Sequence, residues 1–192
     1  MSQRAYWTID AEFDAVQSIA ATADFLTLVD RKPHYWKWTV LGLHSAIQGA
    51  LVLALNNDNS VLVQKPGVAR KMLAAFNGDH DFPSPYMDNF LGLYSKARVR
   101  ENLRTGVVPL SDDAKQERAM QALDELRDEF THFNHKTWSI ERIILVECPL
   151  DCCEVLRHLL ECGAIRWYRT SSQKKALSSL TKIERLLQAR AN

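Results

Sequence analysis

Residues 35–55 are apolar on nearly every face of a predicted helix, and this feature constrains the fold more than any other. A helix that is apolar all round must be covered by other elements or by lipid. Its most hydrophobic part, residues 40–55, carries three polar residues, His44, Ser45 and Gln48. It is therefore too short and too polar for a membrane span. We predict a buried central helix in which His44 is a hydrogen-bonded core histidine.

The same segment has a face of small residues at helical spacing, which consists of Gly42, Ala46, Gly49 and Ala50. Small side chains allow a second helix to approach closely. The sequence leaves open whether that neighbour belongs to the same subunit or to a second one.

Turn and breaker residues divide the rest of the chain into further amphipathic segments. Asp10 is a predicted N-cap, and so is Ser111, which is followed by two aspartates. Ser139 is the third predicted N-cap, with Trp138 and Ile143 as a hydrophobic staple and Pro149 kinking or splitting the helix that follows. Besides the helices that start at Ser111 and Ser139, the expected helices cover about 10–29, 68–76, 88–103 and 172–190. No strand is expected, so the predicted fold class is an all-α bundle of about five to seven helices.

The length of 192 residues predicts a single domain, 1–192. A net charge of +1 provides no global attraction to nucleic acid, so any RNA binding must come from a local patch or from dimer symmetry. No signal peptide or membrane segment is expected, and we predict a cytoplasmic protein.

The four cysteines, Cys148, Cys152, Cys153 and Cys162, do not form the pattern of a secreted disulfide framework. We expect them to be small buried helix residues. A zinc site with His158 is the alternative, although the chain has no Cys-x2-Cys pair. Residues 79–81, Asp-His-Asp, could also bind a metal, but loop polarity explains them equally well. We therefore predict no metal and no cofactor.

Arg127 and His132 form the pattern with the clearest chemical meaning. Arginine can hold a phosphate through two hydrogen bonds, and histidine can move a proton near neutral pH. With its arginines and 6 histidines, the chain is expected to contain about one such Arg–His spacing by chance. The significance of the pattern therefore depends on the residues around it. That context is the end of an amphipathic helix, followed by residues 134–141, Asn-His-Lys-Thr-Trp-Ser-Ile-Glu.

An arginine, a polar residue, three further residues and a histidine in an all-helical chain of this length resemble the HEPN superfamily. The resemblance covers about residues 8–165 as helix order and is sharp only over 126–141. It implies a metal-independent endoribonuclease that leaves a 2′,3′-cyclic phosphate and acts in a toxin–antitoxin, stress or phage-defence setting. It also implies a homodimer whose active site lies at the subunit interface, with RNA as substrate and a cognate antitoxin or other protein as partner. Some members carry a modified tyrosine two residues after the histidine, where this chain has Asn134.

Five residues along an ideal helix separate two side chains by roughly 140°, so Arg127 and His132 cannot both face one small ligand from a straight helix. They could meet if the helix ended between them, or if two-fold symmetry brought copies from both subunits together. Asp128 could orient Arg127, Glu129 could hold His132, and His135 is a second candidate acid or base. The predicted RNA-backbone contacts are Lys96, Arg98, Arg100 and Arg104.

Two alternatives remain open from the residues alone. One is a non-catalytic HEPN-like dimer that binds RNA or a partner protein through the same cleft. The other is a metal-binding regulator that uses the cysteines with His80 or His158.

Overall fold

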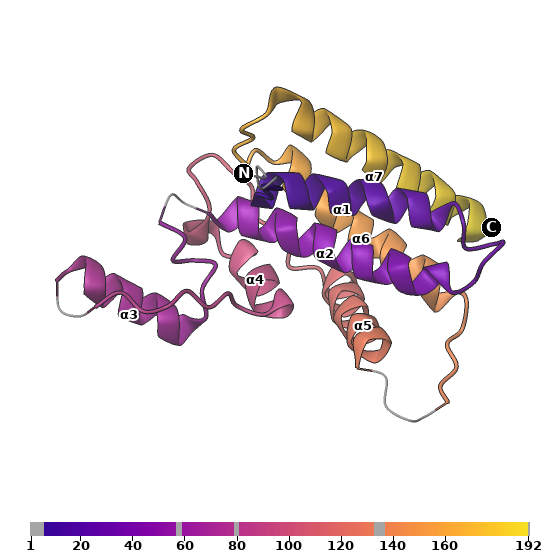
Figure 1. Ribbon diagram of the computed structural model, residues 1–192, viewed down its shortest axis with the longest axis horizontal. Helices are drawn as coiled ribbons and strands as arrows, with labels where there is room; N and C mark the ends of the chain where they lie inside the picture. Colours follow the sequence, from indigo (N-terminus) through magenta and orange to yellow (C-terminus); the bar gives the residue numbers. More distant parts are fainter. Residues whose placement is uncertain (1–5, 57–58, 79–80, 133–136, 192) are drawn as a thin grey trace, which may run out of the picture.

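The computed structural model describes residues 6–56, 59–78, 81–132 and 137–191, and this part of the chain is an all-α bundle (Figure 1). The predicted fold class is therefore confirmed. A single isolated bridge between Gln64 and Met87 is the only β pairing in the described ranges. The elements in chain order are α1 (Ala11–Leu26), α2 (Tyr35–Leu55), α3 (Pro66–Phe76), α4 (Phe90–Ala97), the 3₁₀ helix η1 (Arg100–Asn102), α5 (Ala114–Thr131), α6 (Ile144–Glu161) and α7 (Thr170–Ala191).

Helix α2 lies at the centre of the bundle, as its apolar sequence predicts. It packs against α1, α4, α5 and α6, while α7 covers α1 and α6 on the outer side (Figure 1). Leu43, Ile47 and Leu51 lie on its fully buried face. Among the described helices, α2 is the one long and apolar enough to cross a membrane by length and composition. Its packing against four other helices is that of a core helix.

The small-residue face of α2 contacts α1 of the same chain. A Cβ atom placed on Gly42 would lie 2.5 Å from Oγ1 of Thr22, and one placed on Gly49 would lie 2.8 Å from Cβ of Ala15. The two glycines therefore allow α1 and α2 to approach closely. This answers the question that the sequence left open, and it removes the small-residue face as support for a dimer.

The predicted helix starts are right at one position and wrong at two. The side chain of Asp10 accepts a hydrogen bond from the amide of Phe13 at 2.7 Å and caps α1, as predicted. Helix α5 is capped by Asp113 and not by Ser111, whose hydroxyl bonds the side chain of Gln116. Since Asp113 is the residue directly before the helix, its carboxylate is the one within reach of the free amides.

The third predicted start, at Ser139, is also wrong because α6 begins at Ile144. Trp138 instead packs edge-on against Phe130 of α5, with ring centroids 5.1 Å apart. The proposed hydrophobic staple is therefore absent. Pro149 lies inside α6 and does not split it.

Glu12 joins the first helix to the start of the last one. Its carboxylate is 1% exposed and accepts hydrogen bonds from the amides of Tyr168 and Arg169 and from the hydroxyl of Ser172. Burial opposes the charged form, but these hydrogen bonds outweigh it and lower the pKa of Glu12. The buried carboxylate thus fixes where α7 begins relative to α1.

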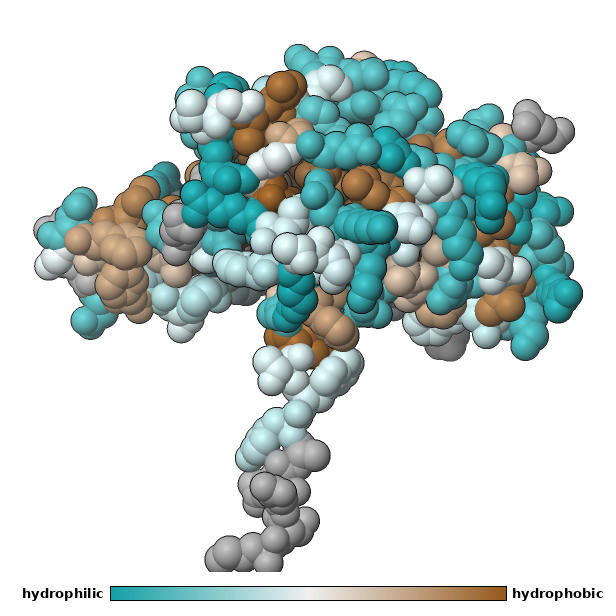
Figure 2. Space-filling model, turned by 90° about the horizontal axis from the view of Figure 1, so that it is seen from above, coloured by the Kyte–Doolittle hydropathy of each residue, from teal (hydrophilic) through white to brown (hydrophobic). Residues whose placement is uncertain are grey.

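Helix α3 projects from the bundle as a separate lobe (Figure 1). It buries only Met72 and Ala75, whereas Leu73 is 50% exposed and Phe76 is 55% exposed. Phe76 packs edge-on against Phe82, which is itself exposed. The lobe accordingly presents an apolar surface at one end of the molecule (Figure 2).

Candidate functional site

Arg127 lies on α5, where its guanidinium is held by two carboxylates. It contacts Asp128 at 2.6 Å through Nη1 and Asp124 at 3.4 Å through Nη2, and its Nε lies 3.5 Å from Nε2 of His44. The side chain remains 30% exposed. The predicted contact between Asp128 and Arg127 is thus confirmed, and Asp124 is a partner that the sequence did not identify.

His44 supports this cluster from the core. It is 3% exposed, stacks on Phe90 with ring centroids 4.0 Å apart, and lies 2.9 Å from Oδ1 of Asp124 through Nε2. This confirms the prediction of a hydrogen-bonded core histidine. Nε2 carries at most one proton, and the shorter contact indicates that it donates to Asp124. The longer approach of Arg127 to the same atom is then not a second hydrogen bond.

His44 is neutral in this setting. Burial is the largest cause and lowers the pKa of His44, and the positive charge of Arg127 lowers it further. The hydrogen bond to Asp124 acts in the opposite direction without overcoming them. With His44 neutral, Arg127, Asp124 and Asp128 together carry a formal charge of −1, because one cation faces two carboxylates.

His132 lies at the C-cap of α5 with its side chain exposed. Its amide donates to the carbonyl of Asp128 at 2.8 Å, so the helix is regular up to this residue. Helix α5 thus runs to Thr131, and only His132 itself leaves the helical dihedral region, with φ −106° and ψ 49°. An ideal helix separates side chains five residues apart by roughly 140°. Within the described residues, the side chain of His132 has no hydrogen bond to Arg127. One chain alone does not bring the two residues together.

Glu129 and His135 are the other two candidates around the motif. Glu129 lies on α5 and is half-buried. His135 lies outside the described residues.

The predicted RNA-binding cations are engaged in contacts within the chain. Lys96 pairs with Asp88 at 2.7 Å and donates to the carbonyl of Gln64 at 2.6 Å. Arg98 pairs with Asp112 and, at 3.4 Å, with Glu117. These contacts connect α4 to the loops and helices around it and neutralise both cations.

The other two cations bind backbone carbonyls. Arg100 donates to the carbonyls of Leu103 and Arg104. Arg104 donates to the carbonyls of Gly163 and Ala164, beyond the end of α6. The four residues therefore all make contacts within the chain that stabilise loops.

Three of the four cysteines are buried helix residues, as the sequence predicts, whereas Cys162 is half-buried at the C-cap of α6. Cys148, Cys152 and Cys153 are buried, and the thiols of Cys148 and Cys152 both contact the carbonyl of Ala119 at 3.4 Å. Burial raises the pKa values of Cys152 and Cys153, so both are protonated thiols. Within the described ranges, no group of three or more histidine, cysteine and acidic side chains is arranged to hold a metal ion. Residues 79 and 80 of the Asp-His-Asp segment are outside those ranges.

No protein-family model, curated protein or solved structure matches this chain.

Proposed function

We propose that this protein is a metal-independent endoribonuclease of the HEPN type whose active site is completed by a second copy of the chain. The observation that supports it is the arrangement on α5, where Arg127 is fixed but 30% exposed and His132 is exposed at the helix end. Two-fold symmetry doubles both residues around one axis, so Arg127 of one subunit can act with His132 of the other.

The chemistry follows from the RNA. The 2′-hydroxyl loses its proton to one histidine and attacks the adjacent phosphorus, and the bond from phosphorus to the 5′-oxygen breaks. A general acid, for which His135 is the candidate, protonates the leaving 5′-oxygen, which gives a 2′,3′-cyclic phosphate and a 5′-hydroxyl. The guanidinium of Arg127 stabilises the charge that develops on the phosphorane. A cognate antitoxin or other protein partner and a cytoplasmic location are part of the same proposal.

A second candidate function is a dimeric module that binds RNA or a partner protein without cleaving RNA. A specific observation favours it, namely that Asp124 and Asp128 already pair with Arg127. A phosphate must displace at least one of these carboxylates before it can accept two hydrogen bonds from the guanidinium.

Incubation with RNA distinguishes the two candidates. The ribonuclease should cut RNA in excess chelator, leave 2′,3′-cyclic phosphate ends and be inactive on DNA or on RNA with a 2′-O-methyl group at the cut. His132→Ala should lower the rate by about 10²–10⁴-fold. Arg127→Lys should also be impaired, because an ammonium cannot make the bidentate contact.

The control is Arg118→Lys, which changes an exposed arginine on the same helix and should leave the rate unchanged. Loss of activity in chelator, or full activity of His132→Ala, would contradict the mechanism. Binding of RNA without cleavage under any condition would support the second candidate.

A further inference from the structure

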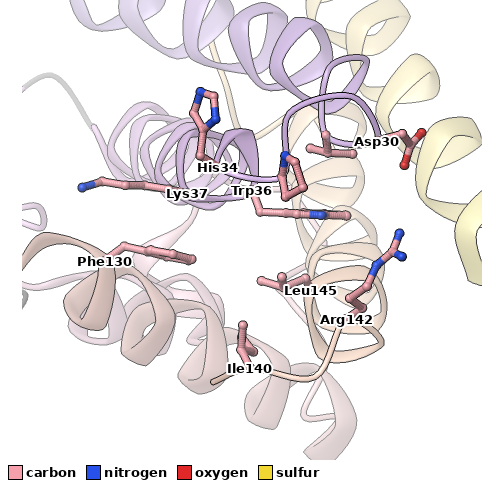
Figure 3. A pocket seen from close by; sticks show the side chains of 10 residues that line it. Asp30, His34, Trp36, Lys37, Phe130, Ile140, Arg142 and Leu145 are labelled. Atoms are coloured by element: carbon pink, nitrogen blue, oxygen red, sulfur yellow. The ribbon is translucent and has the colours of Figure 1, made fainter. Parts of the chain in front are cut away.

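A cavity of about 480 Å³ lies between the α1–α2 loop, the start of α2, the end of α5 and the segment that leads into α6 (Figure 3). Ligand sites in proteins typically have about 300–1,000 Å³. The cavity is separate from the cluster around Arg127, and none of the residues assigned to RNA cleavage lines it.

The walls of the cavity are apolar. Trp36, which is 6% exposed, extends from α2 on one side, and Ile140 and Leu145 lie on the other (Figure 3). The full set of apolar lining residues is Val29, Pro33, Trp36, Phe130, Ile140 and Leu145. Such walls bind an apolar body by removing it from water.

The charged residues around the cavity leave an excess of positive charge. Asp30 is neutralised by Arg190, whose guanidinium contacts both carboxylate oxygens. Lys37 lies on one side of the cavity and Arg142 on the other (Figure 3). Among the described residues, neither forms an ion pair with a carboxylate, and Lys37 only lies over the ring of Trp38 at 5.5 Å.

We propose that this cavity binds a small amphipathic anion, with an aliphatic or aromatic body against Trp36 and a carboxylate or similar group paired with Arg142 or Lys37. Two cations that no carboxylate in the described part of the chain neutralises, beside an apolar space, match such a ligand in both charge and polarity. A neutral ligand of the same shape leaves these cations unpaired, and a cationic one is repelled by them.

The test uses the purified chain without RNA, so its outcome is independent of ribonuclease activity. Anilinonaphthalene sulfonate, a fluorescent apolar anion, should bind with one saturable site per chain. Decanoate should displace it, whereas decanol should displace it more weakly and decylammonium least. At least one of the variants Arg142→Gln and Lys37→Gln should weaken decanoate binding by about tenfold, the change expected on losing a charge-assisted contact.

Arg31→Gln is the matched control, because Arg31 is exposed in the neighbouring loop and does not line the cavity. It should bind decanoate like the original chain. Ile140→Trp, which fills the space, should abolish binding while the melting curve shows that the bundle is folded. If Ile140→Trp does not fold, the Arg142→Gln and Lys37→Gln variants still test whether the cavity binds the anion, because Arg142 and Lys37 lie at its rim. The proposal is overturned if the anion does not bind saturably, if decanol competes as well as decanoate, or if both glutamine variants bind normally.

Discussion

At the scale of single residues, the buried side chain of His44 influences the orientation of Arg127, which is partly exposed at the surface. Its ring stacks on Phe90 and its Nε2 bonds Asp124, and Asp124 in turn contacts Arg127. A neutral histidine therefore orients the carboxylate that restrains the exposed arginine. Protonation of His44 brings a positive charge into a buried site beside Arg127, which is unfavourable.

The first prediction concerns the pH dependence of stability. The folded pKa of His44 lies below its ordinary value of 6.5, so the unfolded chain binds more protons in the window between the two. Stability should therefore fall as the pH is lowered through that window. His44→Gln should flatten this part of the profile, measured as urea midpoints at about pH 7.5 and about pH 5.5. An unchanged slope in His44→Gln would contradict the account.

At the scale of elements, the periodicity of apolar residues predicts the helices well, whereas their partners are set by contacts far apart in sequence. The central position of 35–55 follows from a helix that is apolar on every face. The pairing of His44 with Asp124 joins residues 80 apart, and Glu12 reaches Ser172 across 160. A single sequence shows which face is buried but not what covers it, so neither contact could be predicted.

Helix starts show the same limit. Ser111 and Asp113 are both good N-caps, and local sequence does not choose between them. Ser139 has the residues of a helix start, but residues 137–143 are not helical and Trp138 packs on Phe130. In the candidate site, the sequence identified Arg127, Asp128 and the core role of His44. It could not show that α5 stays regular up to His132.

The second prediction concerns the junction of α1 with α7. Glu12→Gln should lower the free energy of unfolding by about 2–3 kcal/mol, because the amide group of glutamine must face amide donors that now bond a carboxylate. Denaturant unfolding would measure the loss. Asp14→Asn, an exposed acid in the same helix, should change stability little. Equal effects of the two substitutions would show that the buried carboxylate has no special role.

The third prediction concerns the contact of α1 with α2. Gly49→Ala should cost about 1–3 kcal/mol, because the new methyl group would overlap Ala15 and push the helices apart. Gly67→Ala is the control in α3, where a Cβ would meet nothing within 4 Å. It should be neutral or slightly stabilising. A neutral Gly49→Ala would mean that α1 and α2 are not packed as closely as described.

At the scale of the whole molecule, the described chain is a bundle around α2 with a projecting α3 lobe, a cavity beside α5 and the proposed half-site at the end of the same helix. The small-residue face of α2 is already covered by α1, so it leaves no surface for a second subunit. A dimer must therefore use another surface. The proposed site requires one in which the α5 ends of two chains approach each other, because an ideal helix separates Arg127 and His132 of one chain by roughly 140°.

The most direct test of the composite site is complementation between two inactive variants. Arg127→Ala and His132→Ala should each lack ribonuclease activity alone. If the variants are unfolded and refolded together, half of the dimers contain one chain of each kind. One of the two sites in such a dimer has both an intact arginine and an intact histidine, so activity should return to about a quarter of that of the original protein. A mixture as inactive as its two components, with light scattering showing mixed dimers, would contradict the claim that the site is shared between subunits.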